Sequence, residues 1–335
     1  MRLKRRTPVI ALAALLLLFL IVPPLSGRCA PGFCLETLLG GLMTGVLYSL
    51  VALGLVLIFK ASGVFNFAQG AMVLFAALSV ARLAEAMPLY LAVALAIVIM
   101  VALAWLVERL VLRHLINQEA VVLLMATLGV SYFLDGFGQI VWGNDIYRIE
   151  LGLPKEPMLI WQNVFDGGVL IGTEDMVAAI VAALLVLVLA LFFQKTPTGR
   201  ALRAVADDHQ AAQSIGIPLN RIWVIVWSVA GMVALVAGMV WGAKLGVQFS
   251  LAQVALKALP VVILGGLTSV PGAIIGGLIV GVGEKWAEVL YAPELVKYFD
   301  LAGGGIENWF AYVLCLLFLL VRPEGLFGEK HIDRV

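Results

Sequence analysis

The sequence contains little charge. Only 13% of its 335 residues are Asp, Glu, Lys or Arg, and 63% are hydrophobic, whereas an ordinary soluble domain is about 25% charged and about 45–50% apolar. The net charge of +1 provides no basic surface for nucleic acid and no acidic tail for a cationic partner. A water-soluble globule of this composition could not cover its apolar side chains. These shortages place the protein's function inside a lipid bilayer.

Residues for several kinds of membrane enzyme are also missing. A phosphate-binding loop requires Gly-Lys before Ser or Thr, and the only Lys followed by Ser or Thr, Lys195, is preceded by Gln194. The three histidines lie outside the long apolar runs, and there is no HExxH motif, which argues against intramembrane serine proteases and metalloproteases. We therefore expect a non-enzymatic chain that does not hydrolyse ATP alone, with no catalytic residue, metal or cofactor.

Long charge-free runs dominate what remains. They cover residues 7–27, 37–59, 61–81, 86–107, 120–134, 176–194, 222–243, 258–283 and 308–321, the fifth extending to about Trp142. A helix of about 20 apolar residues crosses about 30 Å of hydrocarbon, and the runs lack the two-residue alternation of barrel strands. We predict an all-α, polytopic bundle of about eight spanning helices. Run 258–283 is expected to form a re-entrant or broken helix, since Gly265, Gly266 and Pro271 lie near its middle.

The positions of Lys and Arg orient these spans. With a cytoplasmic N-terminus and a re-entrant 258–283, 14 of the 22 basic residues fall in cytoplasmic segments. A full crossing by 258–283 changes that number by one, so the glycines rather than the charges favour re-entry. The preferred topology has both termini in the cytoplasm. It divides the chain into an N-terminal helix and outer loop (1–36), a transmembrane domain (37–322) with a periplasmic loop (143–175) and a cytoplasmic loop (195–221), and a C-terminal tail (323–335).

The N-terminal part leaves two questions open. Run 7–27 fits an uncleaved membrane helix, which its length favours, or a secretory signal peptide. Cys29 and Cys34 share a short outer loop, where they could form a disulfide or stay unlinked.

Polar residues within the apolar runs are candidates for a solute pathway. Asp135 lies toward the outer interface, where it could pair with headgroups or a neighbouring helix, or could bind substrate or an ion. At the junction FKASGVFNFAQGAM, Asn66 and Gln69 lie near the positive end of a helix dipole, a suitable place for a carboxylate. Capping of the helix by Asn66 is the alternative.

The cytoplasmic loop KTPTGRALRAVADDHQAAQSIGIPLNR predicts a short amphipathic helix. Thr198 can cap it, Leu202, Val205, His209 and Ala212 share one face, and Gly216 and Pro218 end it. The apolar face could pack against the protein's own membrane domain or enter a groove of a soluble subunit.

This loop resembles a known motif. QAAQSIG, residues 210–216, is similar to the EAA-x-x-x-G pattern of bacterial ABC importer permeases, although Gln210 replaces the Glu. TPTGRALRAVADDHQAAQSIGI, GLMTGVLYSLVALGLVLIFKASGVFNFAQGAM, ALPVVILGGLTSVPGAIIGG and RPEGLFG together resemble LivH-type permeases for branched-chain amino acids, from about Leu38 to Gly328. Where the family more often has His-Gly, this chain has Gln69-Gly70.

The resemblance implies a permease chain of the bacterial inner membrane that forms half of a translocation pathway. Its expected partners are a second permease chain, identical or homologous, two ABC ATPase subunits and a periplasmic solute-binding protein. The expected ATPase-coupling residues are Arg200, Arg203, Gln210, Ala211, Ala212 and Gly216, of which Ala212 and Gly216 are expected to face the ATPase groove. The alternatives are an ABC permease for urea, amides or aromatic acids, and an ion-coupled secondary carrier that uses Asp135 and the Asn66 region.

Overall fold

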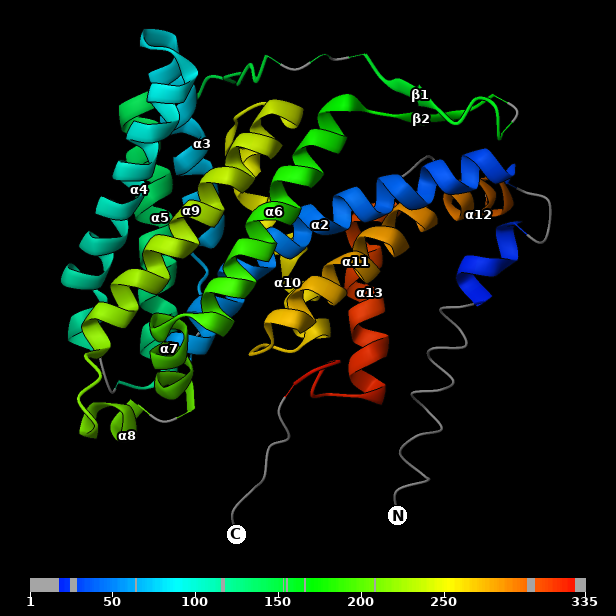
Figure 1. Cartoon of the computed structure of the whole chain (residues 1–335). Helices are drawn as coiled ribbons and strands as arrows, with labels where there is room; N and C mark the ends of the chain where they lie inside the picture. Colours follow the sequence, from blue (N-terminus) through cyan, green and yellow to red (C-terminus); the bar gives the residue numbers. More distant parts are fainter. Residues whose placement is uncertain are drawn as a thin grey trace, which may run out of the picture. The chain divides into compact units, whose positions relative to one another are not determined.

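The computed structural model describes residues 18–24, 29–63, 65–115, 118–152, 154, 156–165, 167–207, 209–299 and 305–328. In these ranges the regular secondary structure is helical apart from one short antiparallel hairpin and an isolated bridge between Tyr147 and Val247. The hairpin pairs β1 (Met158–Ile160) with β2 (Val169–Ile171), with Met158 opposite Ile171. The described part of the structure confirms the all-helical architecture that the sequence predicts (Figure 1).

The helices follow the apolar runs closely. The long ones are α2 (Pro31–Ser62), α3 (Gln69–Ala86), α4 (Leu89–Leu110), α5 (Ala120–Trp142), α6 (Thr173–Lys195), α9 (Leu219–Leu245), α11 (Val270–Trp286) and α13 (Ile306–Val321). The shorter ones are α7 (Pro197–Asp207), α8 (His209–Ser214), α10 (Val254–Gly265), α12 (Ala292–Phe299), the 3₁₀ turns η1 (Leu112–Leu115) and η2 (Phe249–Gln253), and the π-helical turn η3 (Ala287–Tyr291).

Six helices of the described chain, α2 to α6 and α9, are long and apolar enough to cross a membrane. The last predicted run forms a shorter apolar helix, Trp309–Val321, and the first lies largely outside the described residues, with 18–24 helical. The protein is a multi-pass membrane protein, as the charge-free runs predict.

The segment that includes run 258–283 is a bent pair of helices. Its two arms, Phe249–Gly265 and Val270–Phe299, meet at 117°. Gly266 has φ +105°, a conformation that favours glycine, and the Ser269 hydroxyl caps α11 by accepting the Gly272 N–H at 3.1 Å. Pro271 lies in the first turn of α11, where its missing N–H costs nothing. A broken helix is therefore present, and its bend of more than 90° turns the chain back.

The chain forms two compact units. The first comprises residues up to Ser49, 153–181 and 260 onward. Within it, α2 and α11 cross with their backbones almost in contact, because a Cβ on Gly45 would lie 2.7 Å from the Gly277 oxygen and one on Gly41 would lie 2.7 Å from the Val282 Cα. Small residues spaced four apart permit such an approach, as the glycine pattern suggests.

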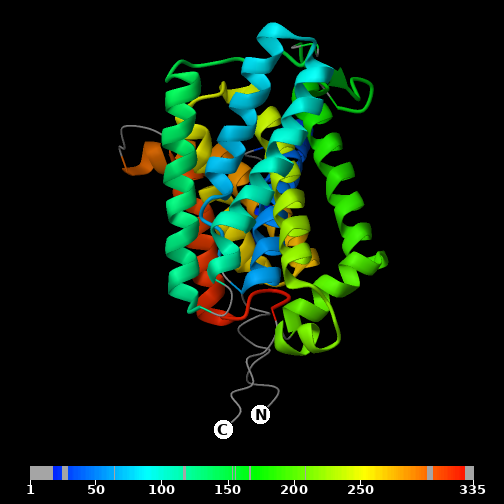
Figure 2. The same cartoon turned by 90° about the vertical axis from the view of Figure 1, so that its left-hand side faces the viewer.

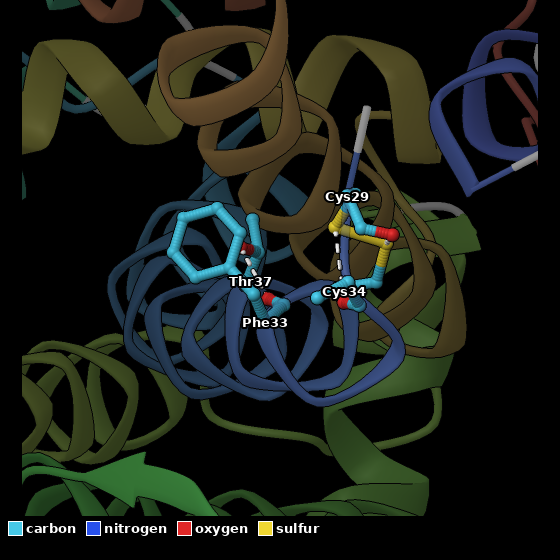
Figure 3. Close-up of a disulfide and its surroundings, with 5 residues drawn as sticks. Cys29, Phe33, Cys34 and Thr37 are labelled. Carbon is cyan, nitrogen blue, oxygen red and sulfur yellow. Dashed lines mark hydrogen bonds between the residues drawn. A yellow bond between two sulfur atoms is a disulfide. The ribbon is translucent and has the colours of Figure 1, made fainter. Parts of the chain in front are cut away.

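A disulfide joins Cys29 and Cys34 at the start of α2 (Figure 3). Both cysteines are buried, and they pack with Trp286 and Leu290. Nearby, Phe19 stacks on Tyr291 at 4.7 Å, and the Tyr291 hydroxyl donates to the Phe19 carbonyl at 2.8 Å. The disulfide therefore belongs to the contact between the first helical residues and the end of α11, and it answers the question that the sequence leaves open.

The second unit comprises residues 50–152 and 182–259. Helix α3 is buried without interruption from Gln69 to Ala81 and packs against α4, α5 and α9, whose arrangement can be followed in Figure 2. Gly238 of α9 allows close packing, since a Cβ there would lie 2.5 Å from the Val73 carbonyl oxygen. This core positions the polar residues described next.

Candidate functional site

An irregular segment, described at residues 63 and 65–68, separates α2 from α3. Gly63 has φ +70° and ends α2. The Thr127 hydroxyl of α5 lies 3.4 Å from both the Phe65 carbonyl oxygen and the Phe67 N–H nitrogen. The Thr127 hydroxyl therefore hydrogen-bonds backbone groups that have no partner within a helix. Inside a membrane such groups must find a partner within the protein, because lipid offers none.

Asn66 and Gln69 are fully buried in this segment. The Asn66 Oδ1 accepts the Ala68 N–H at 3.0 Å, and its Nδ2 donates to Gln69 Oε1 at 3.5 Å. Gln69 Nε2 in turn donates to the Ala230 carbonyl of α9 at 3.4 Å. The N-cap of α3 is Ala68 and has no side-chain capping bond, so Asn66 does not cap the helix: its oxygen closes a turn onto the Ala68 N–H. Both amides hold the start of α3 in place.

These bonds also locate the start of α3 relative to α9. Ala230 is the twelfth of the 27 residues of α9, about 17 Å from its beginning at 1.5 Å per residue. The irregular segment therefore lies near the middle of a span and not at its end. The sequence places Asn66 at a junction but does not indicate this depth.

Asp135 occupies the sixteenth of the 23 positions of α5 and is half-exposed. Its Oδ1 atom is buried, and nothing in the described chain donates a hydrogen bond to it. The structure does not bring Asp135 into the hydrogen-bonded group formed by Asn66 and Gln69.

The loop over residues 195–221, which the sequence predicts to be cytoplasmic, contains α7 and α8. Thr196, not the predicted Thr198, caps the start, because its hydroxyl accepts the Gly199 N–H at 3.1 Å. The Arg203 guanidinium donates to the carbonyls of Phe193 and Gln194 at the end of α6. Leu202 and Val205 are buried. Arg203 therefore joins α7 to α6, whereas Arg200 is exposed.

The end of α8 is exposed. Ala211, Gln213, Ser214, Ile215 and Gly216 all face outward, and Ile215 is 74% exposed. Ala212 is only 2% exposed, so it does not face a partner as the sequence suggests. Gly216 ends the helix with φ +88°, which favours glycine, and the Gln210 side chain lies outside the described part.

Sequence reasoning missed two kinds of residue. Ile215 follows the helical residues and lies outside the predicted apolar face, although a large apolar residue beside a helix-ending glycine was a usable signal. Tyr48 and Glu284 form a buried pair, in which the Tyr48 hydroxyl donates to Glu284 Oε1 at 3.0 Å. Glu284 stands one residue beyond run 258–283, so it is not among the polar residues found within the apolar runs. In the described ranges, no group of three or more His, Cys, Asp or Glu residues is placed to hold a metal ion.

Comparison with known proteins decides the family. Residues 37–321 match the model of the branched-chain amino acid transport system, permease component. The chain belongs to this family. It is therefore the permease component of an ABC transporter, a non-catalytic transport subunit.

Several permeases are similar to this chain over most of its length. The high-affinity branched-chain amino acid transport system permease protein LivH of Salmonella typhimurium is 28% identical, with 90% of this chain and 98% of that protein covered. BraD of Pseudomonas aeruginosa, described in the same words, is 28% identical with the same coverage. A probable branched-chain amino acid transport permease protein LivH of Methanocaldococcus jannaschii is 29% identical over 86% of this chain and 91% of that protein.

Proposed function

We propose that this permease chain forms half of an importer's translocation pathway for branched-chain amino acids or similar small carboxylates. Its proposed partners are a second permease chain, two ATPase subunits and a periplasmic solute-binding protein. The proposed location is the bacterial inner membrane with both termini in the cytoplasm. Family membership supports the class of transporter, and the names of the similar permeases support the class of substrate.

The exposed end of α8 carries the proposal. A chain without a phosphate-binding loop must be driven by ATP hydrolysis in another subunit, and that subunit needs a surface on this chain to bind. Ala211 and residues 213–216 offer such a surface, while buried Leu202 and Val205 anchor α7 to the protein's own domain. Ile215 supplies an exposed apolar side chain suited to a groove in an ATPase.

The connection between α6 and α7 suggests how motion would be passed on. Gly199 has no room for a side chain, since a Cβ there would lie 2.2 Å from the Phe193 carbonyl oxygen, and Arg203 bonds the last carbonyls of α6. ATP-driven closure of the ATPases would displace α8, and this tight connection would carry the displacement into the spans. ATP binding would thereby favour one of two access states of the pathway.

The outer surface would receive the solute-binding protein. Residues 143–175 form the docking segment in this proposal, and its hairpin is attached to α2 because the Leu170 N–H donates to the Glu36 carboxylate at 3.1 Å. Exposed Trp161 and Val164 lie between the two strands. Exposed apolar side chains on a held hairpin are typical of protein contacts.

We assign Asn66, Gln69 and Asp135 to the substrate pathway in different roles. Asn66 and Gln69 would act as positioning residues, since their amides are engaged within the chain. Asp135, with a buried oxygen that lacks a donor in the described part, would contact solute. The helix break around Gly265, Gly266 and Pro271 would allow α10 and α11 to adjust during transport.

Uptake in membrane vesicles containing the complete assembly tests the proposed function. Leucine uptake should require internal ATP and the solute-binding protein, and it should survive collapse of the proton and sodium gradients. Uptake that persists without ATP and stops when an ion gradient is collapsed would establish an ion-coupled carrier instead. ATP-dependent uptake of urea, an amide or an aromatic acid without leucine uptake would overturn the substrate assignment.

A further inference from the structure

A line of polar side chains runs along α5. Thr127, Ser131, Asp135 and Gln139 recur at intervals of four, and apart from Tyr132 they are all the polar side chains of this helix. Residues four apart lie one above another on a helix, drifting by about 40° per step, and the line is about 18 Å long. It extends over more than half of a membrane span.

The two ends of this line differ in exposure. Thr127 is buried, Ser131 and Asp135 are half-exposed, and Gln139 is exposed. At the buried end, Thr127 contacts the backbone of Phe65 and Phe67 in the irregular segment. The line therefore begins beside irregular backbone near mid-span and becomes more open toward the end of α5 that the predicted topology places outside.

Lipid is an unsuitable environment for this line. A carboxylate in hydrocarbon costs several kcal/mol, and the Asp135 Oδ1 has no hydrogen-bond donor within the described residues. Another face of α5 carries exposed Phe133, Phe137 and Ile140, which suit lipid or an apolar partner. The polar line thus requires water, solute or a polar protein surface.

We propose that this line faces the water-filled pathway and binds a zwitterionic α-amino acid, with the substrate ammonium on the Asp135 carboxylate. Gln139, one turn further along α5, donates a hydrogen bond to the substrate's carboxylate. The choice of an amino acid as the substrate rests on the proposed function, whereas the location of the polar line rests on the structure. The line links Asp135 to the Asn66 segment through Thr127 and Ser131.

Cysteine labelling tests the position of the line. The variants are Ser131→Cys and Gln139→Cys in a Cys315→Ser background, with Phe133→Cys and Ile140→Cys as controls at similar depth on the apolar face. The full assembly in vesicles is treated with a charged, membrane-impermeant methanethiosulfonate. Cysteines at 131 and 139 should react at least about tenfold faster than those at 133 and 140, because charged reagents enter water and not hydrocarbon.

Equal labelling of all four positions, or no labelling at 131 and 139, overturns the proposal. These outcomes do not depend on uptake. Failed leucine uptake with labelling at 131 and 139 overturns the proposed substrate and leaves the water-filled line standing.

Protection by solute tests the role of Asp135 without the binding protein. Leucine should slow labelling of the Ser131→Cys variant, and adding Asp135→Asn should raise the protecting concentration about tenfold, since a lost charge-assisted bond has about that effect. Each variant's own unprotected labelling rate is the reference, because removing the Asp135 charge one turn away changes the reactivity of the thiol. The 2-oxo acid of the same carbon skeleton lacks the ammonium and should not protect. Equal protection by both compounds, or an unchanged leucine concentration with Asp135→Asn, overturns ammonium recognition.

Discussion

Phe327 donates its backbone N–H to the carbonyl oxygen of Gly265 at 3.0 Å. The Leu326 N–H likewise reaches the Leu264 carbonyl at 2.8 Å. Gly265 ends α10, and the last carbonyls of a helix lack partners within it. The RPEGLFG motif after α13 therefore completes the hydrogen bonding of the broken helix, a physical role that its resemblance to other permeases did not reveal.

Removing one of these donors should destabilise the break. Phe327→Pro deletes the N–H, while Phe327→Ala retains it and controls for the ring. We expect Phe327→Pro to cost about 1–3 kcal/mol beyond Phe327→Ala, because the Gly265 carbonyl is left without its partner. Thermal unfolding of the detergent-solubilised chain measures the difference, and equal melting temperatures for the two variants would contradict it.

The crossing of α2 and α11 should tolerate no side chain at Gly45. A Cβ there would lie 2.7 Å from the Gly277 oxygen, whereas one at Gly40 meets nothing within 4 Å. Gly45→Ala should therefore destabilise the protein by about 1–3 kcal/mol through overpacking, and Gly40→Ala should not destabilise it. The matched pair differs only in position on one helix, and similar unfolding curves would refute the close crossing.

The exposed end of α8 predicts a separation of folding from ATPase binding. Ile215→Glu should abolish co-purification of the ATPase with little change in stability, since exposed substitutions usually stay within about 0.5 kcal/mol. Gln213→Glu, also exposed and adding one negative charge, is the control and should retain most of the ATPase. Full ATPase recovery with Ile215→Glu would remove this residue from the coupling surface.

Ala212→Glu should behave differently because Ala212 is buried. It places a charge inside the packing of α8, so the melting temperature should fall together with ATPase recovery. A folded Ala212→Glu protein of normal melting temperature would restore the interpretation in which this residue faces the partner.

Arg203 should matter for transmission of motion. Arg203→Ala removes the donors to the Phe193 and Gln194 carbonyls, so uptake should fall severalfold even where the ATPase still binds. Arg200→Ala is the matched control on an exposed position of the same helix. Comparison of leucine uptake with ATP hydrolysis in vesicles gives the readout. Unchanged coupling in Arg203→Ala would show that the corner between α6 and α7 carries no motion.

Much of the fold could be predicted because hydrocarbon imposes one simple demand. A span must be long, apolar and internally hydrogen-bonded, and each of these properties leaves a trace in the sequence. Gly265, Gly266 and Pro271 predict the broken helix for a similarly local reason. The sequence does not decide which threonine caps α7, because Thr196 and Thr198 both lie near its start.

The site was less accessible to prediction because its contacts join distant residues. The Gln69–Ala230 bond spans 161 residues, and Tyr48 reaches Glu284 across 236. No local pattern shows that Asn66 lies beside Thr127 or that Ala212 is buried while Ile215 is exposed. Such relations appear only once helices pack. The amphipathic spacing left open whether the apolar face covers the protein's own domain or a partner, and the resemblance directed Ala212 toward the partner.

The mid-span start of α3 restricts how any access change could occur. Acyl chains cannot solvate the peptide groups of residues 63 and 65–68, so protein or enclosed water must surround this stretch at every stage of a transport cycle. Helices that shelter it can tilt or slide, but none can withdraw and leave it facing lipid. The stretch is thus expected to behave as a stationary axis about which neighbouring spans rearrange.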